Sequence, residues 1–329
     1  MKILFFDAKS YDIEAFDKAV KNYKGIELDY VESDLSIKTA SLVDGHDAVC
    51  GFVSSDFSAP VIEKLASKGI KLILLRCAGF NNVDMAAAKA AKISVFRVPG
   101  YSPEAVAEHA MALALAVNRR IHKAYVKVRE NDFALSGLQG KNLRGKVAGI
   151  IGTGKIGATM AKICAGFGMR VIAYDKFPNK NLTFIEYMSL HDVLEQADLI
   201  SIHCPLTDEN YHMINKKTIA TMKDGVILVN TSRGELVDTD DLIQGIRDFK
   251  FHGVGLDVYE EERNNVFENR STDIMETSIV SRLLSFPNVI VTSHQAFFTE
   301  EALAAISTTT LDNASAFAAG KPLENNQVK

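Results

Sequence analysis

The sequence predicts an α/β protein built on parallel sheets, and three observations support this. Short apolar runs alternate with helix-length amphipathic stretches along almost all of the 329 residues. The runs are rich in Val and Ile and mostly do not alternate in polarity, which is typical of strands buried on both faces. A glycine-rich turn also joins one run to a helix, as in doubly wound folds. The chain length suits two domains.

Each apolar run is a predicted strand. The first group covers residues 2–6, 26–31, 48–53, 71–75 and 93–98. The second group covers residues 147–152, 170–174, 199–203, 226–230, 253–258 and 288–292. Helices are expected between the strands, which gives sheets with helices on both faces.

The segment after residue 98 breaks this alternation. Ser102 is a candidate N-cap, Pro103 suits the first helical position, and Glu104 suits the positive end of a helix. The apolar pattern then continues to about Val128, so we expect one unusually long helix. We interpret it as a connector between two domains, and packing wholly inside one domain is an equal alternative. Its apolar residues occupy more than one face, which is compatible with burial against another subunit.

Composition excludes several classes of function. A net charge of −4 and a pI near 6.1 argue against nucleic acid or an anionic membrane as a partner. The four scattered cysteines, without a CxxC pair, indicate reduced thiols in a cytoplasmic protein. The N-terminal apolar run is too short for a signal peptide, and the run at 110–117 is too short to span a bilayer. No two histidines stand at ligand spacing beside an acid pair, so we expect no metal.

The glycine-rich turn reads Gly152-Thr153-Gly154-Lys155-Ile156-Gly157 and lies between a predicted strand and a predicted helix. In this pattern the first glycine permits a tight turn, the second lets a pyrophosphate approach the backbone, and the third lets helix and strand pack closely. The helix N-terminus then offers N–H groups to the phosphates. In this context the pattern predicts a dinucleotide site.

Asp175 ends the next predicted strand, 23 residues after Gly152. This is close to the ~20-residue offset of the carboxylate that binds the ribose hydroxyls of NAD. The alternative is an acid that simply ends a strand. Lys176 follows directly and would weaken discrimination against NADP. We therefore expect NAD as the cofactor.

Polar side chains follow five successive predicted strands. They are Asp175, then His203-Cys204-Pro205, then Thr231-Ser232-Arg233-Gly234, then Asp257 with the glutamates after it, and finally His294. Because ligands of open parallel sheets bind beyond the carboxyl ends of the strands, this pattern favours a site at that edge. An arginine, carboxylates and a histidine beside NAD suggest hydride transfer to a carbonyl.

The chemistry of such a transfer assigns roles. Arg233 can grip a carboxylate and polarise the adjacent carbonyl with its planar fork. His294 is the natural proton donor, and a nearby anion would keep it charged. One of Glu260, Glu261 and Glu262 can supply that anion, but the residues alone do not choose which. A surface arginine, a packed histidine and solvated glutamates are the structural alternatives.

Four motifs together resemble the D-isomer-specific 2-hydroxyacid dehydrogenases: residues 152–157 (GTGKIG), 229–234 (VNTSRG), 257–260 (DVYE) and 293–297 (SHQAF). Within that family, residues 76–84 (RCAGFNNVD) and 104–110 (EAVAEHA) resemble the fermentative bacterial D-lactate dehydrogenases. The resemblance covers essentially the whole chain. The D stereochemistry is implied by this resemblance alone.

The resemblance implies roles for individual residues. Arg233 matches the substrate-binding arginine, His294 the proton donor, and Glu262 its carboxylate partner. The implied substrate contacts are Ala78, Gly79, Tyr101 and Phe297. The implied cofactor contacts are Gly152, Thr153, Gly154, Lys155, Ile156, Gly157, Asp175, Cys204, Pro205, Asn210, Thr231, Ser232 and Asp257.

The resemblance also implies the layout: two Rossmann-like doubly wound domains, with an NAD-binding domain at 101–298 inserted into a substrate (catalytic) domain formed by 1–100 and 299–329. The helix after Ser102 would form a homodimer, or part of a tetramer. The polar segment 263–276 is expected to be an inserted surface loop.

The expected activity is NADH-dependent, reversible reduction of pyruvate to D-lactate. A dehydrogenase for bulkier 2-keto acids, such as phenylpyruvate or branched-chain substrates, is the first alternative. A non-catalytic NAD-sensing protein is the second.

Overall fold

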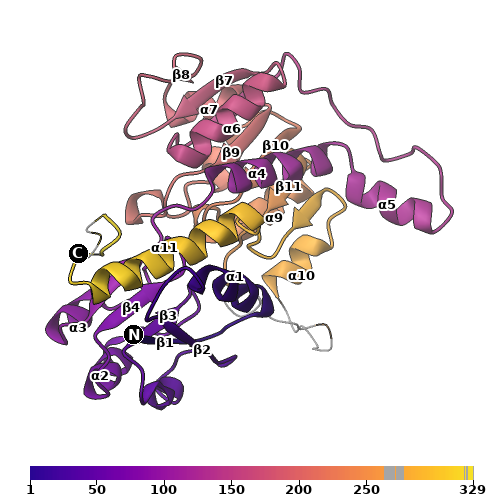
Figure 1. Cartoon of the computed structure of the whole chain (residues 1–329). Helices are drawn as coiled ribbons and strands as arrows, with labels where there is room; N and C mark the ends of the chain where they lie inside the picture. Colours follow the sequence, from indigo (N-terminus) through magenta and orange to yellow (C-terminus); the bar gives the residue numbers. More distant parts are fainter. Residues whose placement is uncertain (263–270, 272–277, 322, 324, 329) are drawn as a thin grey trace. The chain divides into compact units, whose positions relative to one another are not determined.

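The computed structural model describes residues 1–262, 271, 278–321, 323 and 325–328. The chain divides into two compact units (Figure 1): unit 1 comprises Met1–Ser102 and Phe298–Lys329, and unit 2 comprises Pro103–Phe297. Each unit has its own parallel sheet with helices, so the predicted α/β class is confirmed. Except for Ser271, the predicted surface loop at 263–276 lies outside the described residues.

The sheet of unit 1 has the strand order β2-β1-β3-β4-β5, and all neighbours are parallel. Its strands are β1 (Lys2–Phe5), β2 (Glu27–Tyr30), β3 (Ala48–Gly51), β4 (Leu72–Leu75) and β5 (Ser94–Arg97). Its helices are α1 (Ser10–Val20), α2 (Ala59–Ser67), α3 (Met85–Ala90), α11 (Glu300–Ala318) and the 3-10 helix η1 (Thr39–Val43). α11 packs on α1 and also contacts β4 and β5, so a helix from the far end of the sequence completes the core of this unit.

The end of the chain also contributes to the sheet of unit 1. Gln327 forms an antiparallel bridge with Phe96 of β5. The backbone N–H of Arg97 donates to the carbonyl of Asn326, and that of Val328 donates to the carbonyl of Val95. This short segment therefore pairs with the edge of β5.

The sheet of unit 2 has the order β12-β11-β10-β9-β6-β7-β8 and is parallel throughout. Its strands are β6 (Val147–Ile151), β7 (Arg170–Tyr174), β8 (Glu186–Tyr187), β9 (Leu199–Ile202), β10 (Val226–Asn230), β11 (Phe251–Leu256) and β12 (Val289–Val291). Its helices are α4 (Pro103–Asn118), α5 (Ile121–Arg129), α6 (Lys155–Gly166), α7 (Leu190–Gln196), α8 (Lys216–Thr221), α9 (Thr239–Arg247) and α10 (Ile279–Leu284), with the 3-10 helices η2 (Asp208–Asn210) and η3 (Gly234–Leu236).

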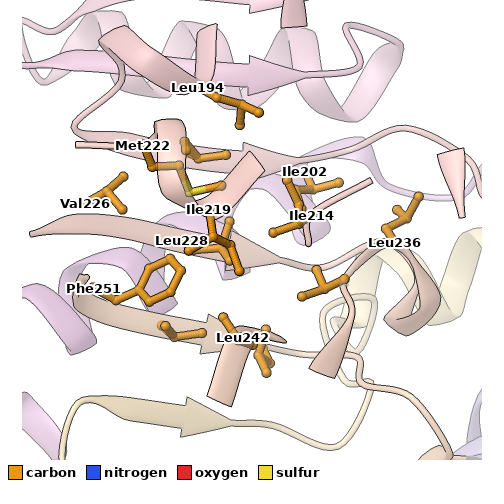
Figure 2. Packing of buried hydrophobic residues seen from close by; sticks show 14 of the residues in the cluster. Leu194, Ile202, Ile214, Ile219, Met222, Val226, Leu228, Leu236, Leu242 and Phe251 are labelled. Carbon is orange, nitrogen blue, oxygen red and sulfur yellow. The ribbon is translucent and has the colours of Figure 1, made fainter. Parts of the chain in front are cut away.

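Two apolar clusters cover the two faces of this sheet. On one face, α4 and α6 pack on residues such as Ile150 and Val229 of the central strands. On the other face, side chains of α7, α8 and α9 pack on the same strands, and Figure 2 shows Ile219, Leu228 and Phe251 within this second cluster. Burial on both faces explains why the strands are continuous apolar runs.

The predicted strands are all present, with ends that differ by a few residues. Strand β8 was missed. It has only two residues, Glu186 and Tyr187, and lies at the edge of the sheet next to β7, where apolar residues are not required. A strand of this kind has no apolar run to mark it.

The prediction of one continuous helix from Pro103 to about Val128 is wrong. α4 ends at Asn118, and α5 begins at Ile121. Between them Arg120 adopts a left-handed conformation, with φ 53° and ψ 36°. Its side chain donates to the carbonyl of Val117 at 3.1 Å and to that of His252 at 2.6 Å, so it satisfies a carbonyl that the end of α4 leaves unpaired. α4 lies entirely within unit 2 and packs on β10, β11 and α6, which favours the alternative to a connector.

In the described part of the chain, no helix combines the length and the apolar character needed to cross a membrane. Cys50, Cys77 and Cys164 are buried free thiols, and Cys204 is a half-buried one.

Candidate active site

The strand order of unit 2 reverses between the neighbours β6 and β9. From β6 the chain proceeds to β7 and β8 on one side, and from β9 to β10, β11 and β12 on the other. In doubly wound sheets, ligands bind beyond the carboxyl ends of the strands at such a reversal. Gly152 directly follows β6, and His203 directly follows β9. The fold thus places the predicted glycine turn at the reversal point.

The geometry of the turn explains its glycines. Gly152 has φ +88°, and a Cβ there would lie 2.7 Å from the backbone nitrogen of Cys204. A Cβ on Gly157 would lie 1.9 Å from the carbonyl oxygen of Gly152. A Cβ on Gly154 would meet no atom of the described chain within 4 Å. α6 begins immediately afterwards at Lys155 and Ile156, and the N–H groups of a first helical turn have no acceptor within the helix. These features fit a bound pyrophosphate.

Asp175 follows β7 and is oriented by the glycine turn. Its Oδ2 accepts hydrogen bonds from the backbone N–H of Thr153 at 2.5 Å and from the Thr153 hydroxyl at 2.8 Å. Its Oδ1 accepts from the N–H of Phe177 at 2.7 Å. An ionised carboxylate has about four acceptor positions, so Asp175 can also accept from ribose hydroxyls. The neighbouring Lys176 forms an exposed ion pair with Glu209 at 2.6 Å.

The loops after β9 and β10 are tied together near this turn. The Ser232 hydroxyl donates to the carbonyl of Cys204 at 2.6 Å. Asn210 donates to the carbonyl of Pro205 at 2.8 Å, which shapes the same loop. The Thr231 hydroxyl is buried and has no hydrogen-bond partner among the described residues, so it is available to a ligand. Burial raises the pKa of the Cys204 thiol to about 11, so Cys204 stays protonated at neutral pH.

The three consecutive glutamates point in different directions. Glu262 pairs with His294, with 2.9 Å between Oε1 and Nδ1. Its Oε2 accepts from the backbone N–H of Tyr259 at 3.3 Å. Glu260 instead pairs with His212, with 2.7 Å between Oε1 and Nε2. Glu261 is exposed and adopts φ +63°. The structure therefore brings Glu262, and neither of its neighbours, to His294.

Asp257 holds the turn that carries His294. It is fully buried, and its carboxylate accepts from the Thr292 hydroxyl at 2.5 Å and from the N–H groups of Gln295 and Ala296 at 2.9 and 2.8 Å. Burial favours the neutral acid, but these bonds and the one from His109 outweigh it, so the pKa of Asp257 is lowered. The N–H of His294 donates to the carbonyl of Asp257 at 2.8 Å. Asp257 thus fixes the backbone on both sides of His294 through hydrogen bonds.

Arg233 follows β10 and is half-buried. Its guanidinium donates to the carbonyl of Ser232 at 2.6 Å. Within the described residues, no carboxylate lies at ion-pair distance from Arg233. A half-buried guanidinium without a carboxylate partner suits an anionic ligand.

The remaining predicted substrate contacts are divided between the two units. Ala78, Gly79 and Tyr101 belong to unit 1, and the buried Phe297 belongs to unit 2. Ala78 and Gly79 lie in the loop after β4. Arg97 donates to the carbonyl of Ala78 at 2.7 Å and lies over the ring of Phe80, which fixes this loop.

Sequence reasoning missed two histidines that shape this region. His109 on α4 lies 3.1 Å from the Thr292 hydroxyl and 3.4 Å from Asp257. His109 belongs to the segment EAVAEHA, which is recognisable as a motif in the sequence. The motif did not indicate what His109 contacts. His212 gave no signal, because it is 48 residues from Glu260. Among the described residues, no group of three His, Cys, Asp or Glu side chains is arranged to hold a metal ion.

Known proteins resemble this chain in sequence and in fold. Residues 111–296 match the family model described as D-isomer specific 2-hydroxyacid dehydrogenase, NAD binding domain. The chain is 46% identical to D-lactate dehydrogenase of Escherichia coli, with 100% of both chains covered.

Two solved structures are also similar. The pyruvate reductase of Chlamydomonas reinhardtii has a TM-score of 0.93 and 40% identity, with 98% of each chain covered. D-2-hydroxyisocaproate dehydrogenase has a TM-score of 0.90 and 32% identity, covering 100% of this chain and 99% of that one.

Proposed function

The chain belongs to the D-isomer specific 2-hydroxyacid dehydrogenases, NAD-binding oxidoreductases, and on this premise we propose that it reduces pyruvate to D-lactate, reversibly, with NADH. The observation that carries this proposal is the Glu262–His294 pair, at the same sheet edge as Arg233 and the glycine turn. The similar D-lactate dehydrogenase and pyruvate reductase support the choice of substrate.

We assign the NAD-binding role to residues 101–298 and the substrate-binding role to 1–100 with 299–329. Bound NADH supplies the hydride. Gly152, Thr153, Gly154, Lys155, Ile156 and Gly157 bind the pyrophosphate, and Asp175 binds the adenosine ribose. Cys204, Pro205, Asn210, Thr231, Ser232 and Asp257 line the rest of the cofactor site. The open space at Gly154 and the unpaired Thr231 hydroxyl support this assignment.

Arg233 binds the substrate carboxylate and polarises the adjacent carbonyl, because its planar donors match an oxygen pair. Ala78 and Gly79 of unit 1 are proposed to contact the substrate through their backbone N–H groups. The hydrogen bond from Arg97 to the carbonyl of Ala78 supports this role, because it fixes the loop. Tyr101 of unit 1 and Phe297 of unit 2 are the further substrate contacts that we propose.

His294 gives a proton to the developing alkoxide. Because Nδ1 points to Glu262, Nε2 is the nitrogen that transfers the proton. The carboxylate orients the ring and stabilises its charged form. In lactate oxidation the same nitrogen accepts the proton.

The activity is tested by following NADH oxidation with pyruvate, 2-ketobutyrate and phenylpyruvate, with chiral analysis of the product. We expect the highest kcat/KM with pyruvate and D-lactate as the product. L-lactate would contradict the proposal. No oxidation with any 2-keto acid would instead indicate an NAD-sensing protein.

His294→Gln tests the proton donor. We expect kcat to fall by about 10²–10⁴-fold, the usual contribution of a positioned acid, with little change in the Kd of NADH. His191→Gln is the matched control, because His191 is exposed on α7. Near-normal turnover of His294→Gln would rule out this role.

A dehydrogenase for larger 2-keto acids is the second candidate, favoured by the similarity to D-2-hydroxyisocaproate dehydrogenase. A pocket discriminates by only about 1–3 kcal/mol per methylene, so the ratio of kcat/KM values within the substrate panel separates the two candidates. A higher kcat/KM for phenylpyruvate than for pyruvate would favour this second candidate.

We also propose that the protein forms a homodimer through α5 and the segment after it. α5 has no buried residue, and its apolar side chains Ile121, Tyr125 and Val128 share one face and are exposed by 52–62%. Phe133 and Leu135 lie in the segment that follows α5 and are exposed by 72% and 83%. An apolar surface of this kind marks an interaction site. Light scattering should give a dimer that Tyr125→Glu dissociates; a tetramer would require a further surface, and a monomer would contradict the proposal.

A further inference from the structure

Glu260 has a histidine partner of its own, separate from the Glu262–His294 pair. His212 directs Nε2 to Glu260 at 2.7 Å and Nδ1 to Asp238 at 3.1 Å. Each ring nitrogen of His212 thus faces a carboxylate oxygen, so the ring is held from both sides. His212 also stacks on Tyr211, with ring centroids 4.0 Å apart, which fixes the plane of the ring.

Both oxygens of Glu260 are engaged. Oε1 faces His212, and Oε2 accepts from the backbone N–H of Thr239 at 2.9 Å, at the beginning of α9. A carboxylate is favourable at a helix N-terminus. The Glu260 side chain is therefore held at two points of unit 2, one in the loop after η2 and one at the beginning of α9.

The backbone of the turn that carries Glu260 packs tightly against the residue that follows Arg233. A Cβ on Gly234 would lie 2.2 Å from the carbonyl carbon of Tyr259 and 2.6 Å from the nitrogen of Glu260, so only glycine permits this packing. The N–H of His212 donates to the carbonyl of Glu235 at 2.9 Å, one residue further along. The segment after Arg233, His212 and the glutamate turn thus form one packed group.

We propose that Glu260 and His212 are positioning residues that fix the turn so that Glu262 meets His294. This rests on the proposed function of the Glu262–His294 pair. Glu260 and Glu262 are separated only by Glu261, so a shift of the anchored Glu260 displaces the carboxylate of Glu262. The pair transfers no proton to the substrate; it acts through the placement of Glu262.

Glu260→Gln and Glu261→Gln form a matched comparison, because each removes one negative charge from the same turn. A glutamine has a single acceptor oxygen, so Gln at 260 cannot accept from both His212 and Thr239. We expect Glu260→Gln to lower kcat by about tenfold, part of the ~10²–10⁴ that a positioned acid contributes. Its pH profile should show the histidine limb at lower pH. We expect Glu262→Gln to show the same displacement, because it removes the carboxylate partner of His294 itself. Glu261→Gln should match the wild type.

The double variant Glu260→Gln/Glu262→Gln separates placement from an independent effect. We expect kcat of the double variant to be close to that of Glu262→Gln, because the partner that Glu260 positions is already lost. Multiplicative losses would overturn the proposal. Equal shifts of the pH profile in Glu260→Gln and Glu261→Gln would also overturn it, since charge alone would then explain the effect.

A readout without turnover keeps this test separate from the proposed function. The titration of the His294 ring, observed by NMR and assigned with His294→Gln, should move to lower pH in Glu260→Gln and stay unchanged in Glu261→Gln. If the wild type reduces no 2-keto acid but the titration moves as expected, the proposed function fails and the positioning role stands. An unmoved titration in Glu260→Gln would refute the positioning role.

Discussion

Two arginines follow parallel strands in the two units, and their surroundings differ. Arg76 follows β4 of unit 1 and is 2% exposed. It donates to the carbonyls of Phe6 and Asp7 at 3.1 and 2.6 Å and to Asp12 at 3.3 Å. Arg233 follows β10 of unit 2, is half-buried, and donates to the carbonyl of Ser232. Both arginines follow a strand of a parallel sheet, yet Arg76 donates to three acceptors of its own chain and Arg233 to one among the described residues.

The difference shows that position at a strand end does not decide the role of an arginine. Arg76 joins the ends of β1 and β4 and lies over the ring of Phe52 after β3. Its guanidinium is therefore paired with groups of unit 1 itself. Arg233 lacks a carboxylate partner among the described residues and suits an external anion. We therefore expect substitution of Arg233 to reduce activity and substitution of Arg76 to reduce stability.

Arg233→Gln should give the largest effect. We expect kcat/KM for pyruvate to fall by about 10³-fold, as for loss of one preorganised electrostatic donor, with a free energy of unfolding within about 0.5 kcal/mol of the wild type. Steady-state kinetics and urea unfolding measure the two quantities. A large loss of stability in this variant would remove the contrast with Arg76.

Arg76→Met should lower the free energy of unfolding by about 3–5 kcal/mol, because it leaves buried acceptors without a donor. Burial raises the pKa of Asp12, and Arg76 offsets part of this rise. Without Arg76, the buried carboxylate of Asp12 loses the cation that stabilises its charge. Urea unfolding of Arg76→Met and of Arg76→Met/Asp12→Asn measures this effect. We expect the second change to restore part of the loss; no recovery would show that the two carbonyls, and not Asp12, dominate.

His203 extends the comparison to a histidine at the end of β9. Burial lowers its pKa to about 4, below the ~6.5 of an unfolded chain. Between these two pH values the unfolded state binds more protons, so stability falls as the pH falls through this window, by at most about 3.4 kcal/mol. Urea midpoints between pH 4 and 7 should show this fall in the wild type and a flatter profile in His203→Gln. The same slope in both proteins would contradict it.

Glu209→Gln should give the smallest effect. It breaks the exposed ion pair with Lys176 and frees an ammonium next to Asp175. We expect kcat/KM with NADPH to rise by about two- to fivefold, since exposed ion pairs contribute only about 0.2–1 kcal/mol. Kinetics with NADPH and NADH measure it, and Glu209→Gln/Lys176→Gln should cancel the gain. An equal gain in the double variant would show that Lys176 is not responsible.

Most of the fold could be predicted because its strands are buried on both faces and are therefore marked by apolar runs. The break between α4 and α5 could not. It depends on Arg120, a residue type without the usual preference of glycine for a left-handed conformation, and on the carbonyls that its side chain contacts. No local pattern encodes those contacts.

In the site, too, features marked by local sequence could be predicted, and features set by distant contacts could not. The glycine turn and Asp175 follow one another along the chain, so their spacing predicted them. The choice among three adjacent glutamates depended on resemblance, because their partners His212 and His294 are distant in sequence. His109 was missed for the same reason: its contacts with Asp257 and Thr292 exist only after α4 packs on β11.

Unit 1 is discontinuous in sequence, and this has a consequence for biosynthesis. Its sheet is encoded before residue 103, but α11 and the segment that pairs with β5 come after residue 297. At about 5–20 residues per second, a ribosome needs roughly 10–40 s to make the intervening stretch. During that interval the nascent β4 and β5 lack the helix that covers them, whereas unit 2 emerges uninterrupted. Completion of the molecule therefore waits for the last helix to leave the exit tunnel.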